Sequence, residues 1–400
     1  MTSSATSSDS SAGRTRAKWL RQPLRWLGST IRLLVRVGFI GWAGLAIWYS
    51  TVPWMPVRLA LALAFVAFGV WALWFAPKPR GLLLFIGIYL IVLLLWSTIL
   101  PSHDRQWRAD VAVMPRAYID GDTVRLTGVR NFDYLTVNEF SPRYEEREVS
   151  LAHMTGVDFY ISYWMPGPVG HTFVSFTFDD APPLSISIEI RPEVGEGYAP
   201  IASLFKQFEL IYVVGDERDI VRVRTNVRGE DVYLYRVAAP ADDARRLFEL
   251  YLARINQLAD KPEFYHLLSN SCTINIVRYM RALGGSRRFN ARHYLNGLFD
   301  AYLFDQGLLN TSLSFEELRR RSHINAAAEA ANDAPDFSTR IRAQLPASAT
   351  RATQPRIQNR YVAATPLREG MRSAGTTTSL IRNTGCNQRE LGCELLAAGP

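Results

Sequence analysis

One cysteine, Cys272, stands alone in the first 385 residues, inside the run Asn270-Ser-Cys-Thr-Ile-Asn275. Asn270 and Ser271 are residue types that cap helix N-termini, and apolar residues follow them at helical spacing, so the pattern predicts a helix over 272–283. A thiol in the first turn of a helix lies at the positive end of the helix dipole, which lowers its pKa and makes it a better nucleophile. A free cysteine is also a common small core residue, so the thiol alone leaves an inert buried role open.

A thiolate nucleophile needs a base within hydrogen-bond reach, and that base needs a group that orients it. Among the six histidines, His171 follows the glycine-containing turn 167–170 and opens an apolar strand. A residue in this position is expected to be held rigidly and still be reachable by a substrate. A histidine by itself is often structural. A helix-capped cysteine together with a strand-leading histidine, however, gives the two halves of a papain-type thiol site.

The group that orients His171 is expected on the following strand, residues 184–190. If the hairpin turn centres on Ala181, residues 173 and 189 face each other, and both Ser187 and Glu189 share a sheet face with His171. Glu189 is the expected orienter, because a carboxylate accepts the imidazole N–H and stabilises the imidazolium. A solvated carboxylate at a sheet edge is the alternative interpretation.

The oxyanion of an acyl-transfer reaction would be bound by Asn270 or by the backbone amide of Cys272. No metal site and no cofactor are expected, because no second His or Cys stands at ligand spacing from the candidate pair. A serine nucleophile is not favoured either, since the chain has no Gly-x-Ser-x-Gly elbow.

Charged residues gather in loops between apolar strands, where they could form the rim of a site. Arg228 and Arg191 are candidates for binding an anionic head group. Ordinary salt-bridged loops are the alternative. Tyr163 and Trp164 are candidate substrate contacts and are equally typical of core or groove aromatics.

Three long apolar runs, at residues 33–52, 59–76 and 81–100, are each able to cross a bilayer. The basic segment 1–32 and the pair Lys78 and Arg80 are expected on the cytoplasmic side, so the chain from residue 101 onward is expected to be exported. The formal net charge of +8 comes from the two ends of the chain, whereas the middle is mildly acidic. A nucleic-acid partner is therefore not expected, and the expected partner is the membrane.

Residues 107–335 show an α+β pattern. Alternating apolar residues predict strands over 122–127, 148–151, 157–164, 171–178, 184–190, 220–225 and 231–237, and helical periodicity predicts helices over 240–259, 272–283, 292–306 and 314–321. The composition of residues 346–400 is typical of a disordered tail. Its Cys386 and Cys393 are given no chemical role.

Several motifs of this segment resemble one bacterial family, the Lnb-type N-terminal periplasmic domain; they are Arg130-Asn-Phe-Asp-Tyr134, Phe140-Ser-Pro-Arg-Tyr144, His171-Thr-Phe-Val-Ser-Phe176, Ser187-Ile-Glu-Ile-Arg191, Arg224-Thr-Asn-Val-Arg-Gly-Glu-Asp231 and Asn270-Ser-Cys-Thr-Ile-Asn275. The resemblance implies a permuted NlpC/papain-like fold, a bacterial inner-membrane location with the domain in the periplasm, and a Cys/His pair whose roles fall on Cys272 and His171. The namesake branch of the family is a lipoprotein N-acyltransferase. Its membrane helices follow the periplasmic domain, whereas here they precede it.

The sequence thus favours a membrane-anchored periplasmic cysteine acyltransferase or acyl hydrolase that acts on a lipid or lipoprotein. A peptidase or amidase of the cell wall would use the same two residues in a polar cleft. A non-catalytic membrane scaffold with a buried structural thiol is the alternative from another class. The sequence does not specify an oligomeric state.

Overall fold

The structure is a computed structural model that describes residues 11–197 and 199–346, with side chains from residue 25 onward. Residues 347–400, which include nearly all of the predicted tail with Cys386 and Cys393, lie outside the described residues, as do residues 1–10.

Among the described residues, three helices are long and apolar enough to cross a membrane: Arg25–Trp48, Met55–Phe75 and Arg80–Ser97. They correspond to α1 (Ser11–Trp48), α2 (Met55–Val70) with the π-helical turn η1 (Trp71–Phe75), and α3 (Arg80–Ser97). The three spans begin eight, four and one residues before their predicted starts and end four, one and three residues before their predicted ends. Pro56 lies in the first turn of α2. Proline suits this position because an N–H group in the first turn would have no acceptor within the helix. The three helices pack through Ile40, Phe65 and Phe85.

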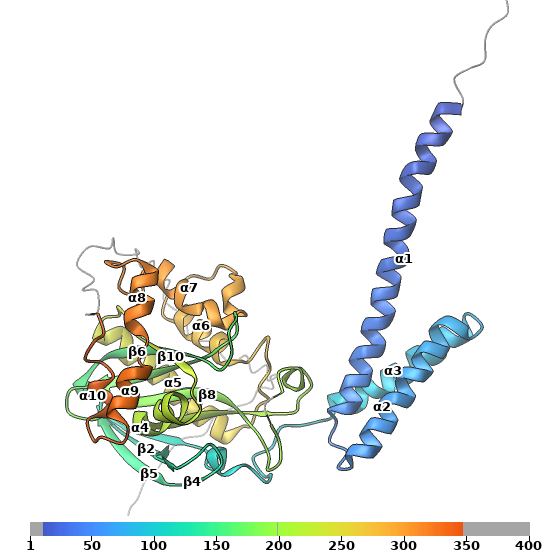
Figure 1. The fold of residues 1–400 in the computed structure, drawn as a ribbon. Coiled ribbons are helices and arrows are strands. Elements are labelled where there is room, and N and C mark those ends of the chain that lie inside the picture. Colours follow the sequence, from blue (N-terminus) through green and yellow to red (C-terminus); the bar gives the residue numbers. More distant parts are fainter. Residues whose placement is uncertain (1–10, 198, 347–400) are drawn as a thin grey trace, which may run out of the picture. The chain divides into compact units, whose positions relative to one another are not determined.

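The C-terminal part of the chain is an α/β domain built on an eight-stranded mixed sheet (Figure 1). The strand order is β1-β2-β9-β8-β7-β6-β10, with β5 also paired to β2; β2 and β9 are parallel and the other pairs are antiparallel. The strands are β1 (Arg116–Asp120), β2 (Thr123–Arg130), β5 (Tyr144–Ser150), β6 (Met154–Tyr163), β7 (His171–Phe178), β8 (Leu184–Arg191), β9 (Glu209–Asp216) and β10 (Asp231–Arg236), and a separate short pair is formed by β3 (Asp133–Tyr134) and β4 (Phe140–Ser141).

Apolar residues of the central strands alternate between two buried clusters, one on each face of the sheet, as the two-residue period of a strand requires. Phe159 and Phe176 pack in the cluster that includes residues of α5 and α6, whereas Tyr160 and Phe173 pack in the cluster that includes residues of α9 and α10. The helices are α4 (Glu217–Ile220), α5 (Ala241–Asp260), α6 (Cys272–Ala282), α7 (Phe299–Asp305), α8 (Phe315–Ser322), α9 (Asn325–Ala331) and α10 (Phe337–Arg340). The sheet therefore has no solvated face at its centre, and polar side chains there must find partners inside the protein.

Two predicted elements are wrong. Residues 220–225 are not a strand: Asp216 ends β9 and its side chain accepts a hydrogen bond from the backbone N–H of Arg218 at 2.9 Å, which starts α4, and a π-helical turn η5 (Val223–Val227) follows. The apolar residues of this segment, such as Ile220 and Val221, are buried together with residues of α9 and α10. Their spacing in the sequence therefore resembles that of a buried strand. The predicted helix 292–306 is instead two 3₁₀ turns, η6 (Ala291–His293) and η7 (Asn296–Leu298), followed by α7.

The register of the β7–β8 hairpin also differs from the prediction. Phe173 lies opposite Ser187, not residue 189, so the turn centres one residue earlier than Ala181. A shift of the turn centre by one residue moves each partner by two positions. Because two is the period of a strand, the predicted sharing of one face by His171, Ser187 and Glu189 survives the error.

Candidate active site

The first residue of β7 and the first residue of α6 come together. His171 begins β7 and pairs with Ser162 of β6, and Cys272 begins α6. The next residues link the two elements, since the hydroxyl oxygens of Thr172 and Thr273 lie 2.9 Å apart. Cys272 is only 2% exposed. The structure thus joins the cysteine and the histidine that the sequence paired, although about one hundred residues separate them.

A row of polar side chains extends from His171 across β8. The Nε2 atom of His171 lies 2.7 Å from Ser187 Oγ, and Ser187 Oγ donates a hydrogen bond of 2.7 Å to Glu189 Oε1. The direct distance from His171 Nε2 to Glu189 Oε1 is 3.8 Å. Glu189 therefore reaches the imidazole through the serine hydroxyl, and not by the direct hydrogen bond that was predicted.

This row determines which nitrogen of His171 carries a proton. A carboxylate only accepts, so the single hydroxyl proton of Ser187 is used on Glu189. The hydroxyl oxygen must then accept from His171, so Nε2 is protonated. The other nitrogen, Nδ1, then keeps a lone pair that can accept from the thiol of Cys272, which is hydrogen-bonded to the His171 side chain. This is the tautomer that a general base acting on Cys272 requires.

The environment of Cys272 favours the thiolate. Burial raises the pKa of the thiol, but the hydrogen bond and positive charge of His171, with hydrogen bonds from the backbone and hydroxyl of Thr172, outweigh burial and lower the pKa to about 6. The position at the start of an eleven-residue helix acts in the same direction. A cysteine of this kind is mostly thiolate at neutral pH, which is the form that reacts.

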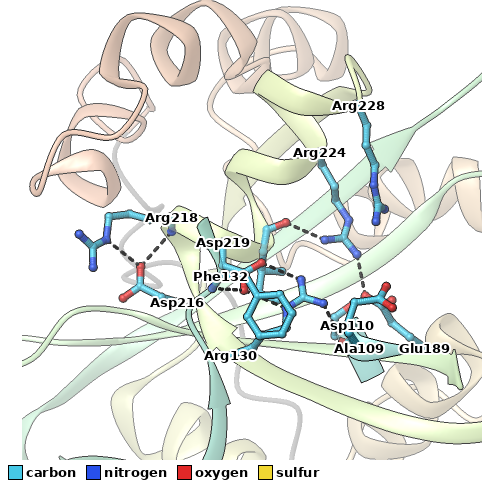
Figure 2. Close-up of polar contacts among 12 residues, drawn as sticks. Ala109, Asp110, Arg130, Phe132, Glu189, Asp216, Arg218, Asp219, Arg224 and Arg228 are labelled. Atoms are coloured by element: carbon cyan, nitrogen blue, oxygen red, sulfur yellow. Dashed lines mark hydrogen bonds and ion pairs between the residues drawn. The ribbon is translucent and has the colours of Figure 1, made fainter. Parts of the chain in front are cut away.

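Glu189 is kept ionised by a cation on its other side. Burial raises the pKa of Glu189, but Arg224 and then His171 outweigh it, so the pKa lies well below its usual range. Arg224 donates a hydrogen bond of 2.7 Å to Glu189 Oε1 and a second one to the backbone oxygen of Ile220 (Figure 2). Its guanidinium carbon also lies 4.9 Å from the ring centroid of Phe173. An ionised Glu189 stabilises a positive charge on His171.

A buried ion pair fixes the segment that carries Arg224. Figure 2 shows Arg130 of β2 facing Asp219 of α4, with hydrogen bonds of 2.9 and 2.8 Å to its two carboxylate oxygens. Asp219 also accepts from the backbone N–H of Phe132, and Arg130 donates to the backbone oxygen of Asp110. Both side chains are buried. The short α4–η5 segment is thereby held against the sheet at the position from which Arg224 reaches Glu189.

Asn296 connects the loop before His171 to Cys272. Its amide oxygen accepts from the backbone N–H of Gly170 at 3.1 Å, and its amide nitrogen donates to the backbone oxygen of the same glycine. The amide nitrogen also lies 3.9 Å from Cys272 Sγ. An amide NH₂ has two hydrogens, so one can serve Gly170 while the other faces the sulfur.

The next residue, Gly297, allows the close approach of these two loops. Its N–H donates to the backbone oxygen of Pro168 at 2.9 Å, and its own oxygen accepts from the Tyr163 hydroxyl at 2.6 Å. A Cβ atom at Gly297 would lie 2.5 Å from the carbonyl carbon of Pro168. Only glycine fits there without displacing backbone.

Asn270 does not face Cys272 with its side chain. Its amide nitrogen donates to the backbone oxygen of Phe264 at 3.0 Å and to Glu263 at 3.3 Å, while its amide oxygen accepts from Asn275 and Arg278. The N-cap of α6 is Ser271, which makes no side-chain capping bond. Asn270 therefore shapes the loop before α6, and the predicted capping and oxyanion roles do not fit its contacts. The backbone amide of Cys272 remains a candidate oxyanion donor.

The predicted rim arginines have internal partners. Arg191 is 2% exposed, donates to the backbone oxygens of Val111 and Ala112, and lies 4.2 Å from the ring centroid of Trp107. Arg228 lies 3.6 Å from Glu230. Arg191 thus holds the segment before β1 against the sheet, so its role is structural and it is not on the rim of a site. Arg228 is partly exposed and stays a candidate for binding an anionic group.

The two aromatic residues that were predicted to contact a substrate, Tyr163 and Trp164, differ in their exposure. Tyr163 is 8% exposed and bonded to the Gly297 loop, so it supports the site from within. Trp164 is 42% exposed, in the loop between β6 and β7 that leads to His171. Trp164 is therefore the one of the pair that can contact a substrate.

One cluster of potential metal ligands is present among the described residues with side chains: His153, Asp179 and Asp180, whose ligand atoms lie within 4.8 Å of one another. All three are exposed, and the two aspartates follow the last residue of β7, at the opposite end from His171. The cluster is no part of the Cys272 site, and exposed acidic groups commonly occur without a metal.

Sequence reasoning missed Asn296 and Arg224 as site residues. Asn296 lay in a segment predicted as a continuous helix, and Arg224 lay in a segment predicted as a strand. The available signal for Asn296 was the following glycine, because Asn-Gly marks a turn rather than a helix interior.

Residues 140–300 match the model of a protein family described as the Lnb N-terminal periplasmic domain. The resemblance predicted from the motifs is thereby confirmed, and the matched segment includes His171, Glu189, Arg224, Cys272 and Asn296. Searches of curated proteins and of solved structures found no match to the chain. Together with the three helices able to cross a membrane, the family match fits a membrane-associated periplasmic protein of the inner membrane.

Proposed function

We propose that this protein is a membrane-anchored periplasmic cysteine acyltransferase or acyl hydrolase that acts on a lipid or lipoprotein. The observation that carries the proposal is the pairing of Cys272, with its pKa lowered to about 6, with a histidine whose far nitrogen is protonated toward Ser187 and Glu189. This arrangement supports nucleophilic catalysis, because it supplies a thiolate, a base and an orienting carboxylate in one row.

In this proposal, His171 Nδ1 takes the proton of Cys272 and the thiolate attacks an ester or amide carbonyl. The backbone amide of Cys272 and the second amide hydrogen of Asn296, whose nitrogen lies 3.9 Å from Cys272 Sγ, would stabilise the oxyanion. The carbon–oxygen or carbon–nitrogen bond then breaks, the leaving group takes the proton from His171, and a thioester remains on Cys272. An amine or water, deprotonated by His171, releases the acyl group and restores the thiol.

Exposed apolar residues beside the site support a lipid-like substrate. The loop 164–170 and the segment 294–298, which are joined through Asn296 and Gly297, carry large apolar side chains that are between 39% and 55% exposed; these are Trp164, Met165, Val169, Tyr294, Leu295 and Leu298. Clusters of exposed apolar residues mark binding surfaces in soluble domains. Such a rim suits an acyl chain better than the polar peptides of the cell wall.

The proposed fold is the permuted NlpC/papain-like arrangement, with residues 107–335 as the periplasmic domain. The order of elements supports it, because His171 on a strand precedes Cys272 on a helix, the reverse of the papain order. The proposed orientation places the N-terminus in the cytoplasm, in agreement with the positive charges of residues 14–36 and of Lys78 and Arg80.

The test is a search for an acyl group on Cys272. The full chain is incubated in detergent with a bacterial phospholipid and lipoprotein extract, and the peptide that contains Cys272 is examined by mass spectrometry. We expect an added acyl mass that hydroxylamine removes, as it does a thioester. The variant C272A must lose it, and H171A must form it far more slowly. The variant H153A, which changes an exposed histidine away from the site, serves as the matched control.

A wild-type chain that acquires no acyl group from lipids but cleaves purified cell-wall peptides would overturn the lipid substrate and select the peptidase. Acylation at equal rates in the wild type and H171A would overturn the proposed mechanism.

A non-catalytic scaffold is a second candidate, and the 2% exposure of Cys272 is the observation that favours it. The two functions differ in the reaction of the native protein with a small thiol reagent. A scaffold thiol reacts only after unfolding, whereas the proposed nucleophile reacts in the folded protein.

A further inference from the structure

The three membrane helices border a partly open cavity of about 620 Å³ between α1, η1 and α3. Its wall is largely apolar and includes Phe39, Leu82, Phe85 and Tyr89, while Arg36 and Lys78 lie in the same wall. Between Leu82 and Tyr89, the lining follows α3 for about 10 Å at the rise of an α-helix. This is comparable with the ~15 Å that one leaflet contributes to a bilayer core of about 30 Å.

The two cations of this cavity have no counter-ion in the membrane-spanning part. Asp9 is the only acidic residue among the first 103 residues, so no carboxylate of the anchor can pair with Arg36 or Lys78. The guanidinium carbon of Arg36 lies 5.0 Å from the ring centroid of Trp74, a contact that orients the side chain without neutralising it. Positive charge at the edge of a bilayer attracts anions, and the neighbouring anions are lipid phosphates.

Both cations lie toward the same side of the membrane, whichever way the protein is inserted. Arg36 of α1 contacts Trp74 of η1, and Lys78 lies in the short connection between η1 and α3. The chain from residue 101 leaves the membrane after α3, which is the other side. The cavity is therefore separate from the Cys272 site.

We propose that this cavity binds one anionic glycerophospholipid, with its phosphate on Arg36 and Lys78 and one acyl chain along Phe39, Leu82, Phe85 and Tyr89. The charge complementarity and the apolar wall select this ligand over a free phosphate, which would leave the apolar wall uncovered. The bound lipid fills the space between α1 and α3 and is not a substrate of the exported domain.

The test is native mass spectrometry of the full chain in detergent, titrated separately with phosphatidylglycerol, with phosphatidylcholine and with inorganic phosphate. We expect one phosphatidylglycerol per chain in the wild type and weaker retention of phosphatidylcholine. The double variant R36Q/K78Q should lose about 30-fold in affinity, as expected for two charges near a lipid surface. The matched control R32Q/R80Q removes the same charge from residues that do not line the cavity, so it should bind phosphatidylglycerol clearly more tightly than R36Q/K78Q does.

A second pair of variants tests the acyl chain with all charges intact. L82W places an indole in the cavity and should reduce retention, whereas L83W changes the neighbouring residue, which does not line the cavity, and should not. Circular dichroism and gel filtration check that each variant is folded. Equal retention by R36Q/K78Q and R32Q/R80Q, retention of inorganic phosphate in place of lipid, or equal retention by L82W and L83W would overturn the proposal.

Discussion

The pKa of Cys272 provides a direct test of its pairing with His171. At a pKa of about 6, Cys272 is roughly nine-tenths thiolate at pH 7. In H171A the hydrogen bond and charge are gone while burial remains, so the pKa should rise above the usual value of about 8.5, and at most roughly one thirtieth of the thiol is ionised at pH 7.

The rate at which a reagent alkylates Cys272 at a single pH is a poor measure of this change in pKa. A thiolate of higher pKa is intrinsically more nucleophilic. With a Brønsted coefficient of about 0.4–0.5, a rise in pKa of about 2.5 units makes the thiolate roughly 10- to 18-fold more reactive, which offsets most of the lost ionisation. The net loss of the alkylation rate at pH 7 is therefore only about two- to threefold, unlike that of acyl transfer, which also needs His171 to move protons. The informative quantity is the midpoint of the pH–rate profile, which should move from about 6 in the wild type to above about 8.5 in H171A.

The assay is the rate of alkylation by iodoacetamide from pH 4.5 to 10, in a C386S/C393S background so that Cys272 is the only thiol. Peptide mass spectrometry follows the modified residue, and H153A is the control with a histidine removed elsewhere. A wild-type midpoint at or above 8.5, or one that H171A leaves unchanged, would refute the argument that His171 holds the thiolate.

Three further predictions concern the groups that support the pair. E189Q removes the charge behind His171 but keeps an acceptor for Ser187, so the alkylation midpoint should rise and the rate of thioester formation should fall at least about 10-fold; an unchanged midpoint would mean that Glu189 is only structural. D219N leaves Arg130 buried without its partner and should lower the free energy of unfolding by about 3–5 kcal/mol in a urea titration, whereas D133N, at an exposed carboxylate, should change it by about 1 kcal/mol or less. G297A places a methyl group against the backbone of Pro168 and should cost about 1–3 kcal/mol of stability and slow acylation, while G156A, where the nearest atom is 3.6 Å away, should leave acylation unchanged.

The juxtaposition of Cys272 and His171 could be predicted because both residues stand at marked positions of the chain. A helix-capping sequence precedes Cys272, and a glycine-containing turn precedes His171. The face shared with Glu189 could also be predicted, since strand parity tolerates a register error of two. The three helices able to cross a membrane were recognisable because a bilayer requires long apolar runs.

The remaining parts of the site depend on tertiary contacts that leave no periodic signal. Arg224 was assigned to a strand because its apolar neighbours are buried between the sheet and two later helices, which no local pattern reveals. Asn296 acts from a turn, and its partners are backbone groups of residue 170. Asn270 was chosen because it is near Cys272 in sequence, but its side chain contacts the preceding loop.

The contacts of Gly170, Asn296 and Gly297 bear on how this site can change during evolution. A Cβ atom at Gly170 would lie 2.8 Å from the backbone oxygen of Ser162, and one at Gly297 would lie 2.5 Å from the carbonyl carbon of Pro168. Asn296 joins the two loops through the backbone N–H and the backbone oxygen of Gly170. A substitution at one of the three positions displaces the partners of the other two. These positions should therefore be inherited as a unit, and related chains in which Gly170 is replaced should also differ at 296 and 297 and should have lost the reactive thiol.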